Sequence, residues 1–345
     1  MTARLAVVLF NLGGPDSPAA VKPFLFNLFS DPAIIRLPQP LRWFVARMIS
    51  GKRAPTAAAI YEKIGGRSPL LPLTEAQGQA LTSALEAFDL GMKVKVFVAM
   101  RYWHPRAADV AKAVAAYAPD QVVLLPLYPQ FSTTTTASSL KEWRGVAEKA
   151  GITARTSAVC CYPVEQGFVQ AQALAIARVL DANPDQRLRI LFSAHGLPKK
   201  VVAAGDPYQV QVEATAKAVA RALNRPDLDW VVSYQSRVGP LEWIGPYTED
   251  EIARAGRDGC GLVVVPVAFV SEHSETLVEL DIEYRHLAEA AGVPAYHRVP
   301  AVGTDPAFIA GLARLVAAKV GRETVAPDGE VRICGPEWSG CLCKG

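Results

Sequence analysis

The feature that most constrains the fold is the regular alternation of short apolar runs with longer amphipathic segments. The runs rich in Val, Leu, Ile and Phe lie at 5–10, 94–100, 122–127, 153–159, 188–192, 230–233 and 262–267. Ala-rich segments with helical periodicity lie between several of them, at 74–88, 107–117, 166–180 and 208–223. Such runs are typical of strands buried on both faces, and their alternation with helices is typical of βαβ units. We therefore predict an α/β fold built on parallel sheets.

A faint internal repeat divides the chain into two halves. The segments 7–15, 96–105 and 122–136 resemble, in the same order, the segments 190–198, 231–240 and 263–277. Buried strands resemble one another, so a single match would mean little, but three matches in one order indicate a duplication. We predict two similar α/β domains that face each other across a cleft. The first is expected to comprise 1–148 with the C-terminal helix and tail, 305–345, and the second 149–304.

The composition excludes several classes of protein. Hydrophobic residues make up 50% of the 345 residues and charged residues 20%, which predicts a large core and excludes a disordered chain. The net charge of +3, without a basic stripe, excludes nucleic acid as a partner. No apolar run approaches the roughly 18 residues of a membrane span. The N-terminus has the pattern of a first strand rather than of a signal peptide, so we expect a cytoplasmic protein.

The run 188–192 ends abruptly at Ser193-Ala-His195-Gly196. In an open α/β sheet, ligands bind at the carboxyl ends of the strands, so His195 lies where a titratable side chain would meet a substrate. The alternative is a structural histidine that bonds to nearby backbone. The first half of the repeat has no histidine at the corresponding place.

A second candidate site is the acidic segment 271–287, which follows the run 262–267. Its carboxylates are spaced by three, four and four residues, at Glu272, Glu275, Glu279 and Glu283. On a helix this spacing places them on one face, and His273 lies among them. An ordinary solvated acidic face is the alternative. Because the segment begins at the carboxyl end of a predicted strand, we interpret it as a path that holds a divalent cation.

The first half carries glycines, hydroxyls and aromatic residues instead of ionisable groups. Gly13 and Gly14 permit close approach of the backbone to a ligand. Neither G-x-G-x-x-G nor G-x-x-x-x-G-K is present, so nucleotide binding is not expected.

The stretch 34–47 is apolar but contains three arginines, Arg36, Arg42 and Arg47. A core helix is one interpretation; its prolines and mixed polarity favour an exposed apolar lip for a membrane or a large apolar ligand.

Half of the six cysteines lie near the C-terminus, at Cys334, Cys341 and Cys343, with gaps of seven and two residues. Three thiolates need a fourth ligand to complete a zinc or [2Fe–2S] site, and this spacing lacks the paired C-x2–4-C of zinc sites. The adjacent Cys160 and Cys161 are candidates for that ligand. The alternative is a reactive tail that binds no metal.

Taken together, the motifs resemble those of the ferrochelatases, enzymes that insert ferrous iron into a porphyrin, over nearly the whole chain. The motifs that carry the resemblance are, in order, NLGGP (11–15), YEKIGGRSPL (61–70), RYWHP (101–105), YPQFSTTTTASS (128–139), SAHGLP (193–198), YQSRVGPLEWIGP (234–246) and VPVAFVSEHSETLVELDIEY (265–284). The resemblance implies two Rossmann-like domains related by approximate duplication, with the porphyrin in the cleft between them.

The resemblance also implies residue roles. His195 would accept a pyrrole proton, bind the iron, or do both in turn, and Glu275 would stand across the cleft as iron ligand or proton relay. A base of near-neutral pKa suits removal of the pyrrole protons, and imidazole with carboxylate can replace the waters of Fe²⁺. Glu272, Glu279 and Glu283 would form an acidic path for metal or protons. The positions implied to contact the porphyrin are Leu12, Tyr61, Ser68, Arg101, Trp243, Phe269 and His273.

The implied reaction inserts Fe²⁺ into protoporphyrin IX to give protohaem, the last step of haem biosynthesis. The nearest rival substrate is coproporphyrin, whose additional carboxylates would favour more cations around the pocket. Two further candidate functions are non-catalytic tetrapyrrole binding and the insertion of cobalt or nickel.

Some bacterial ferrochelatases carry a [2Fe–2S] cluster on a C-terminal extension and one internal cysteine. The resemblance implies such a cluster here, on Cys334, Cys341 and Cys343, with Cys160 as the fourth ligand and Cys161 as its rival. A cluster-bearing tail suggests a homodimer. The apolar lip suggests transient contact with the inner face of the membrane.

Overall fold

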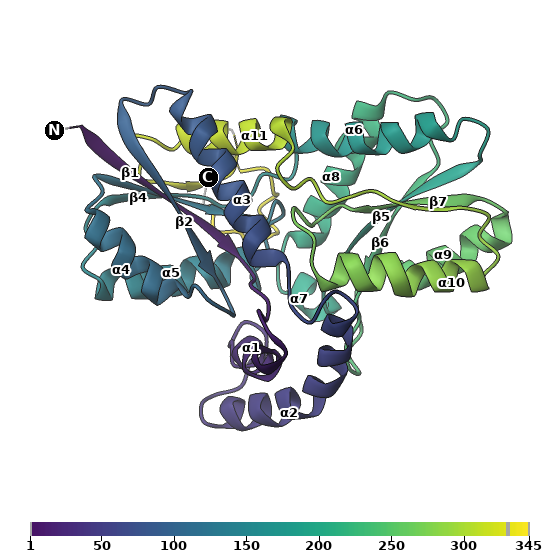
Figure 1. The fold of residues 1–345 in the computed structure, drawn as a ribbon, viewed down its shortest axis with the longest axis horizontal. Coiled ribbons are helices and arrows are strands. Elements are labelled where there is room, and N and C mark those ends of the chain that lie inside the picture. Colours follow the sequence, from purple (N-terminus) through teal and green to yellow (C-terminus); the bar gives the residue numbers. More distant parts are fainter. Residues whose placement is uncertain (1, 329–331, 344–345) are drawn as a thin grey trace.

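The computed structural model describes residues 2–328 and 332–343 and contains two parallel sheets side by side (Figure 1). The first sheet, in the order β2-β1-β3-β4-β9, consists of β1 (Ala3–Asn11), β2 (Met92–Met100), β3 (Gln121–Pro126), β4 (Arg155–Val159) and β9 (Val325–Ala326). The second, in the order β6-β5-β7-β8, consists of β5 (Leu188–His195), β6 (Trp230–Gln235), β7 (Gly261–Pro266) and β8 (Tyr296–Arg298). The described strand pairs are parallel, which confirms the predicted α/β fold of two parallel-sheet domains.

The two sheets share one strand order. β5, β6, β7 and β8 occupy in the second sheet the places that β1, β2, β3 and β4 occupy in the first. The matched sequence segments lie on the pairs β1 and β5, β2 and β6, and β3 and β7. This shared order supports the approximate duplication inferred from the repeat. It also brings the carboxyl ends of corresponding strands to equivalent places in the two domains.

The boundary between the domains lies later than the sequence predicts. The predicted second domain, 149–304, includes β4, but β4 pairs with β3 in the first sheet, with Gln121 opposite Arg155. The chain therefore leaves the first sheet only after Val159. β9 then pairs with β4 and returns the C-terminal part of the chain to the first sheet. Residues 329–331 and 344–345 of the predicted tail lie outside the described residues.

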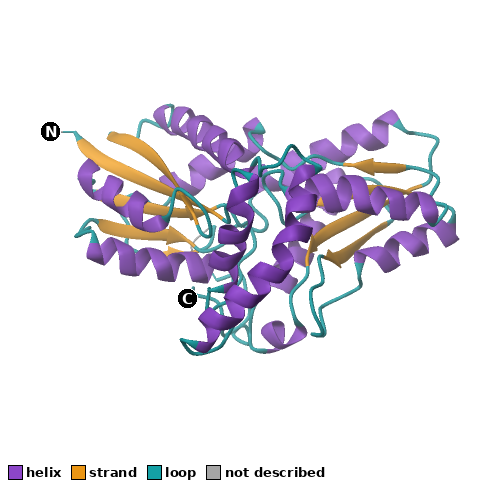
Figure 2. Cartoon of the chain, turned by 60° about the horizontal axis from the view of Figure 1, so that its bottom comes forward, coloured by secondary structure: helices purple, strands orange, loops and turns teal. Residues whose placement is uncertain are grey.

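Helices cover both faces of each sheet (Figures 1 and 2). They are α1 (Val21–Phe29), α2 (Leu41–Glu62), α3 (Leu70–Glu86), α4 (Ala107–Tyr117), α5 (Thr136–Lys149), α6 (Gln166–Ala182), α7 (Lys199–Ala203), α8 (Tyr208–Leu223), α9 (Thr248–Asp258), α10 (Tyr284–Ala290) and α11 (Pro306–Ala317), with a 3-10 turn η1 (Pro18–Ala20) and a π-helix η2 (Glu275–Glu283). α3 and α11 pack together on one face of the first sheet, and α4 and α5 on the other. Because helices cover both faces, every residue of the central strands β3 and β7 is buried.

Local signals define the ends of several helices. In α9, the first turn carries Glu249, Asp250 and Glu251, whose negative charge favours the amino end of a helix. The same helix ends at Gly259, whose φ of 61° is a left-handed conformation that glycine adopts without strain. These signals end α9 shortly before β7 begins at Gly261.

α1 and α2 form an insertion that projects from the first domain, at the bottom of Figure 1. The insertion exposes large apolar side chains, at Ile34, Leu41, Trp43, Phe44 and Met48. Phe44 is 69% exposed and Met48 is 66% exposed, which confirms the predicted exposed lip and excludes the core-helix interpretation. We refer to residues 34–48 as the apolar lip.

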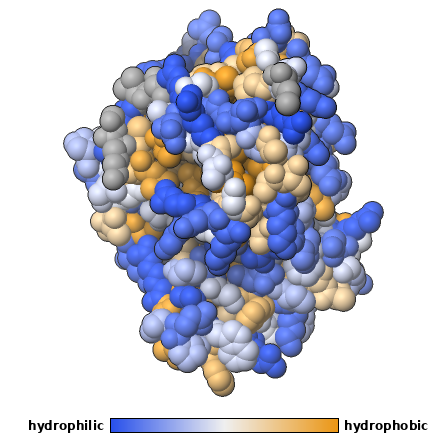
Figure 3. Space-filling view, turned by 90° about the vertical axis from the view of Figure 1, so that its left-hand side faces the viewer, coloured by the Kyte–Doolittle hydropathy of each residue, from blue (hydrophilic) through white to orange (hydrophobic). Residues whose placement is uncertain are grey.

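One face of the first domain is mainly polar. On the face of the first domain shown in Figure 3, hydrophilic residues predominate and apolar residues gather mainly in one hollow in the upper half. Within residues 2–328 and 332–343, none of the helices combines the length and the hydropathy that crossing a bilayer requires.

Candidate active site

His195 is the last residue of β5, at the carboxyl edge of the second sheet, where it lies opposite Gln235 at the end of β6. A Cβ atom on Gly196 would lie 3.2 Å from the carbonyl oxygen of Gln235 and 3.2 Å from the ring of Trp243. Glycine at this position therefore lets the tryptophan ring approach the backbone beside His195.

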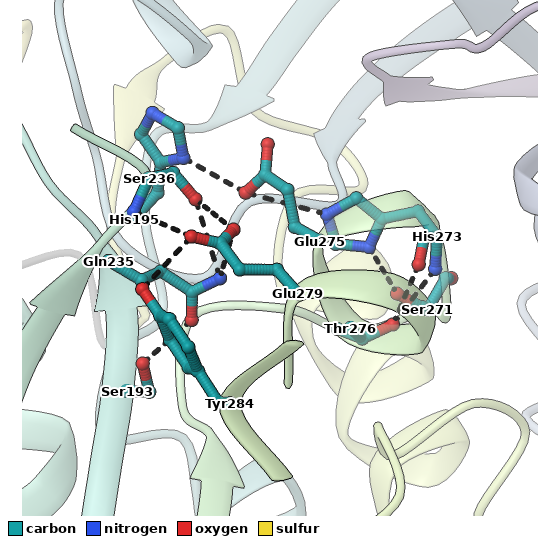
Figure 4. Close-up of polar contacts among 10 residues, drawn as sticks. All are labelled: Ser193, His195, Gln235, Ser236, Ser271, His273, Glu275, Thr276, Glu279 and Tyr284. Carbon is teal, nitrogen blue, oxygen red and sulfur yellow. Dashed lines mark hydrogen bonds and ion pairs between the residues drawn. The ribbon is translucent and has the colours of Figure 1, made fainter. Parts of the chain in front are cut away.

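The centre of the site is a carboxylate that faces two imidazoles (Figure 4). Nδ1 of His195 lies 2.9 Å from Oε2 of Glu275, and Nε2 of His273 lies 3.8 Å from the same oxygen. Burial alone would raise the pKa of Glu275, but the charges and hydrogen bonds of the two histidines outweigh it and hold this pKa well below its usual range. Burial opposes protonation of His195, yet the carboxylates of Glu275 and Glu279 raise its pKa above the ordinary 6.5.

The direct contact between His195 and Glu275 differs from the expectation that Glu275 stands across the cleft. Both residues belong to the second domain, one from β5 and the other from the start of η2 after β7. The strands β5 and β7 are neighbours in the sheet, so their carboxyl ends bring the two side chains together. The histidine and the carboxylate therefore form one hydrogen-bonded unit on one wall.

Glu279 lies next to this unit and is held by four donors. The backbone N–H of Ser236 donates to Oε1 at 2.9 Å, the Ser236 hydroxyl donates to Oε2, Nε2 of Gln235 donates to Oε2 at 3.1 Å, and the Tyr284 hydroxyl donates to Oε1 at 3.0 Å. Burial and the charge of Glu275 raise the pKa of Glu279, while the Ser236 hydrogen bond acts to lower it.

Sequence reasoning missed the residues that hold Glu279. Ser236 has a φ of 63°, a left-handed conformation that is uncommon for a residue with a side chain and that concentrates at functional sites. Gln235 and Ser236 lie in the motif 234–246, at the end of a strand next to β5. This position at the carboxyl edge of the sheet is the sequence signal that identifies them as site residues.

The predicted acidic ladder is not one continuous face. Glu275 and Glu279 face His195, but Glu272 pairs with Arg298 at 2.6 Å. Glu283 pairs with Lys63 at the C-terminal end of α2 at 3.1 Å, and its side chain is 47% exposed. Glu272 lies before the π-helix that spans residues 275–283, and Glu283 is the last residue of that helix, next to the end of α2.

The first domain contributes Tyr61 to the neighbourhood of Glu275, and Ser68 packs against Gly14 close to Tyr61. Tyr61 on α2 is buried, and its hydroxyl hydrogen-bonds to the side chain of Ser274, next to Glu275; burial raises the pKa of Tyr61 to about 12. A Cβ on Gly14 would lie 2.4 Å from the Ser68 hydroxyl, so glycine allows this close packing. Leu12 lies half-buried in the cluster around Tyr61.

Arg101 is paired within the first domain. Its guanidinium lies 2.7 Å from Asp31 and 3.0 Å from Glu142, and its side chain is 13% exposed. The buried carboxylate of Asp31, which the sequence did not single out, also accepts hydrogen bonds from Tyr102 at 2.8 Å and Ser138 at 2.6 Å. The charge of Arg101 is therefore balanced by the protein itself rather than left free for a porphyrin carboxylate.

Aromatic rings flank both imidazoles. The ring centroids of Trp243 and His195 are 6.3 Å apart in an edge arrangement, and those of Phe269 and His273 are 4.6 Å apart. The indole N–H of Trp243 is buried without a hydrogen-bond partner among the described residues. The predicted residues Trp243, Phe269 and His273 thus gather around the predicted catalytic pair.

The cysteines of the tail meet Cys160 and Cys161 in a second cluster, apart from Cys260 in the core of the second domain. Cys341 hydrogen-bonds to the thiols of Cys160 and Cys334, which lowers the pKa of Cys341 and raises the pKa of each partner. The sulfur atoms of Cys160 and Cys161 are 3.7 Å apart.

Cys343 is buried in the same cluster. Thiols from three segments thus converge, and the pKa of Cys341 is lowered, so the residue types are those that hold an iron–sulfur cluster. Within the described part of the chain, no three His, Cys, Asp or Glu side chains already have the arrangement of a metal site. The residue types fit such a cluster, and binding it would require the thiols to adjust.

Comparisons with known proteins agree with the geometry. The family model described as Ferrochelatase matches residues 4–320. The ferrochelatase of Caulobacter vibrioides is 56% identical over 100% of this chain and 99% of its own length, and that of Phenylobacterium zucineum is 53% identical over 99% and 98%. The solved structure of the sirohydrochlorin chelatase SirB from Bacillus subtilis subspecies spizizenii with cobalt has the same fold, with a TM-score of 0.51 at 10% identity over 92% of this chain and 97% of that one. The chain belongs to the ferrochelatase family.

Proposed function

We propose that this chain inserts Fe²⁺ into protoporphyrin IX to give protohaem, with His195 and Glu275 acting on the reacting atoms. Insertion of iron into a porphyrin is the reaction of the family; the porphyrin and the residue roles are the proposal. The observation that carries it is the 2.9 Å contact between Nδ1 of His195 and Glu275 at the carboxyl edge of the second sheet.

This contact supports His195 as the proton acceptor. Because a carboxylate accepts only, the proton of a neutral imidazole lies on Nδ1, which leaves a lone pair on Nε2. Among the described residues, Nε2 has no hydrogen-bond partner, so it is free to take a proton from a pyrrole N–H. The imidazolium that forms is stabilised by Glu275, and the raised pKa of His195 favours this transfer.

The iron is the second substrate. Hydrated Fe²⁺ must exchange water for protein or porphyrin nitrogen before it can enter the macrocycle, and imidazole with carboxylate are suitable temporary ligands. The low pKa of Glu275 keeps this carboxylate charged at neutral pH. Glu279, held by Ser236, extends the acidic wall beside it and would receive the metal or the released protons.

The choice of protoporphyrin over coproporphyrin is supported by the pairing of Arg101. Coproporphyrin carries two more carboxylates, which require cations, but Arg101 is already neutralised by Asp31 and Glu142.

Purified protein should be mixed anaerobically with Fe²⁺ and each porphyrin, and metal insertion followed by absorbance. Faster insertion into protoporphyrin supports the proposal, and faster insertion into coproporphyrin contradicts it. Binding without insertion would indicate a tetrapyrrole-binding protein, and insertion of cobalt or nickel alone a different chelatase.

We also propose that Cys160, Cys334, Cys341 and Cys343 hold a [2Fe–2S] cluster. The convergence of these thiols and the hydrogen bond between Cys341 and Cys160 support this ligand set. When bound, the cluster would link the tail to the segment after β4. Anaerobically purified protein is expected to show iron–sulfur absorption in the visible range and stoichiometric acid-labile sulfide; the absence of both would contradict the cluster.

A further proposal is that the apolar lip contacts a membrane surface transiently. Trp43, Phe44 and Met48 are exposed together, with Arg47 beside the Trp43 ring at 5.6 Å, so the surface combines apolar side chains with a cation. In a flotation experiment with anionic liposomes, the wild-type protein should float, and Phe44→Ser/Met48→Ser should remain at the bottom. Equal distribution of both proteins would contradict the proposal.

The cytoplasmic location and the homodimer remain predictions. Cell fractionation tests the first. Sedimentation equilibrium of protein with and without the tail cysteines tests the second, because the dimer is inferred from the cluster-bearing tail.

A further inference from the structure

The π-helix η2 carries both carboxylates that face His195. π-helical segments are rare and occur mostly at functional sites. The directions of Glu275 and Glu279 depend on the position of this segment, because both side chains project from it. Contacts that hold the segment in place therefore also hold the two carboxylates.

Those contacts come from β8, the edge strand of the second sheet. Nε and Nη2 of Arg298 donate to the two oxygens of Asp281 at 2.8 and 2.6 Å. Nη1 of the same guanidinium donates to Glu272 at 2.6 Å. The hydroxyl of Tyr296 donates to the carbonyl oxygen of Leu280 at 2.6 Å. β8 thus contacts the chain at Glu272, just before η2, and again at Leu280 and Asp281 in the second half of η2.

The guanidinium of Arg298 suits this task better than an ammonium would. Its side chain is only 10% exposed, and the two carboxylates that it joins lie nine residues apart along the chain. A planar fork can serve both at once, with two parallel hydrogen bonds to one of them, whereas a lysine is a single point charge. Glu272 also accepts a hydrogen bond from the backbone N–H of Ala301 at 2.9 Å, which holds this carboxylate in place just before η2.

We propose that Arg298 is a positioning residue for iron insertion: through Glu272 and Asp281 it fixes η2 so that Glu275 meets His195 and Glu279 meets Ser236. It touches neither substrate. Its effect passes through the two carboxylates that face the reacting atoms. This proposal rests on the proposed roles of His195 and Glu275.

The test compares Arg298→Lys with Arg189→Lys. Arg189 is a matched control because it is also a buried arginine of the second sheet that joins two carboxylates, with contacts of 2.9 Å to Asp229 and 2.9 Å to Asp258 and 6% exposure, but it lies near the opposite end of β5. Both variants should lose some thermal stability. Only Arg298→Lys should lower kcat, by about 10- to 100-fold, as is typical for residues that orient metal-site ligands.

The KM for porphyrin and its affinity by fluorescence titration should not change in Arg298→Lys, because Tyr61 and Ser68 of the first domain are untouched. Asp281→Asn provides a second variant of nearly equal size. It should lower kcat in the same way, and the double variant should be no worse than Arg298→Lys alone.

Equal kcat values for Arg298→Lys and Arg189→Lys would overturn the proposal, as would a fall in porphyrin affinity that accounts for the whole loss. His195→Ala separates this failure from failure of the proposed function. If His195→Ala remains active, the catalytic pair is wrong. If His195→Ala is inactive while Arg298→Lys behaves like Arg189→Lys, only the proposed positioning role of Arg298 is wrong.

Discussion

At the scale of single residues, Glu275 controls the electrostatics of the site. It accepts a hydrogen bond from His195, lies 3.8 Å from His273 and is followed one helical turn later by Glu279. Its charge raises the pKa of His195 and also that of Glu279. One carboxylate therefore makes the histidine a stronger base and its neighbour a weaker acid, which separates the roles of groups that lie side by side.

Glu275→Gln should move the pH dependence of kcat/KM. His195 must be neutral to accept a proton, so activity falls as the pH drops through its pKa. Glu275 raises this pKa, and therefore its removal should lower the pKa and shift the acidic limb of the profile to lower pH, in addition to reducing the maximal rate. The exposed Glu289→Gln serves as control and should leave the profile unchanged. An acidic limb that stays in place or moves to higher pH would contradict this account.

At the scale of secondary-structure elements, the apolar lip is joined to the first sheet by a buried ion pair. Asp31, which follows α1, binds Arg101 and Tyr102 after β2 and Ser138 on α5. Three elements thus meet at one carboxylate that is 2% exposed. Removing one partner of a buried pair leaves an uncompensated charge, which costs far more than loss of a surface pair.

Asp31→Asn should lower the free energy of unfolding by about 2 kcal/mol, because Tyr102 and Ser138 lose a charged acceptor while Arg101 keeps its ion pair with Glu142. Asp109→Asn is the control, since Asp109 forms an exposed ion pair with Lys112 at 3.9 Å. Denaturant titration of both variants measures the difference. A change in Asp31→Asn as small as that in the control would show that the network does not anchor the lip.

Strands could be predicted at this scale, but the form of the acidic helix could not. The runs at 5–10 and 188–192 correspond to β1 and β5 because buried parallel strands have continuous apolar sequences. The spacing of Glu275 and Glu279 fits an α-helix equally well as a local pattern. The π-helix is contacted by Tyr296 of β8, 16 residues beyond Leu280, and no local pattern within the helix encodes this contact.

At the scale of the whole molecule, the C-terminal tail connects the two domains. β9 belongs to the first sheet, while Gly340 donates its N–H to Gly205 of the second domain at 3.0 Å. Cys334 accepts a hydrogen bond from Gln211 on α8 at 2.9 Å. Cys160 follows β4 directly, at the point where the chain passes between the domains.

Cys160→Ser should therefore abolish the proposed cluster, whereas Cys161→Ser should retain it. Cys160 hydrogen-bonds to the tail cysteine Cys341, whereas Cys161 lies 3.7 Å from Cys160 and accepts a weak hydrogen bond from Gln211 at 3.6 Å. Acid-labile sulfide and visible absorption of both variants measure the outcome, with Cys260→Ser as a control that should behave as wild type. Loss of the cluster in Cys161→Ser with retention in Cys160→Ser would reverse the ligand assignment.

The duplication could be predicted at this scale because three ordered matches fall on corresponding strands of the two sheets. The domain boundary could not, because the run 153–159 has the composition of any buried strand and its partner, β3, is decided by packing. The sequence predicted only that His195 and Glu275 lie in the same cleft. Their direct contact follows from the adjacency of β5 and β7, which the sequence does not state.

The central claim, that His195 takes part directly in iron insertion, is tested most directly by His195→Ala. Wild type and variant should be supplied anaerobically with Fe²⁺ and protoporphyrin IX, and haem formation followed by absorbance, with thermal unfolding and porphyrin fluorescence as checks of folding and binding. We expect a folded variant that binds porphyrin and forms no haem at a measurable rate. Turnover close to that of the wild type would contradict the account.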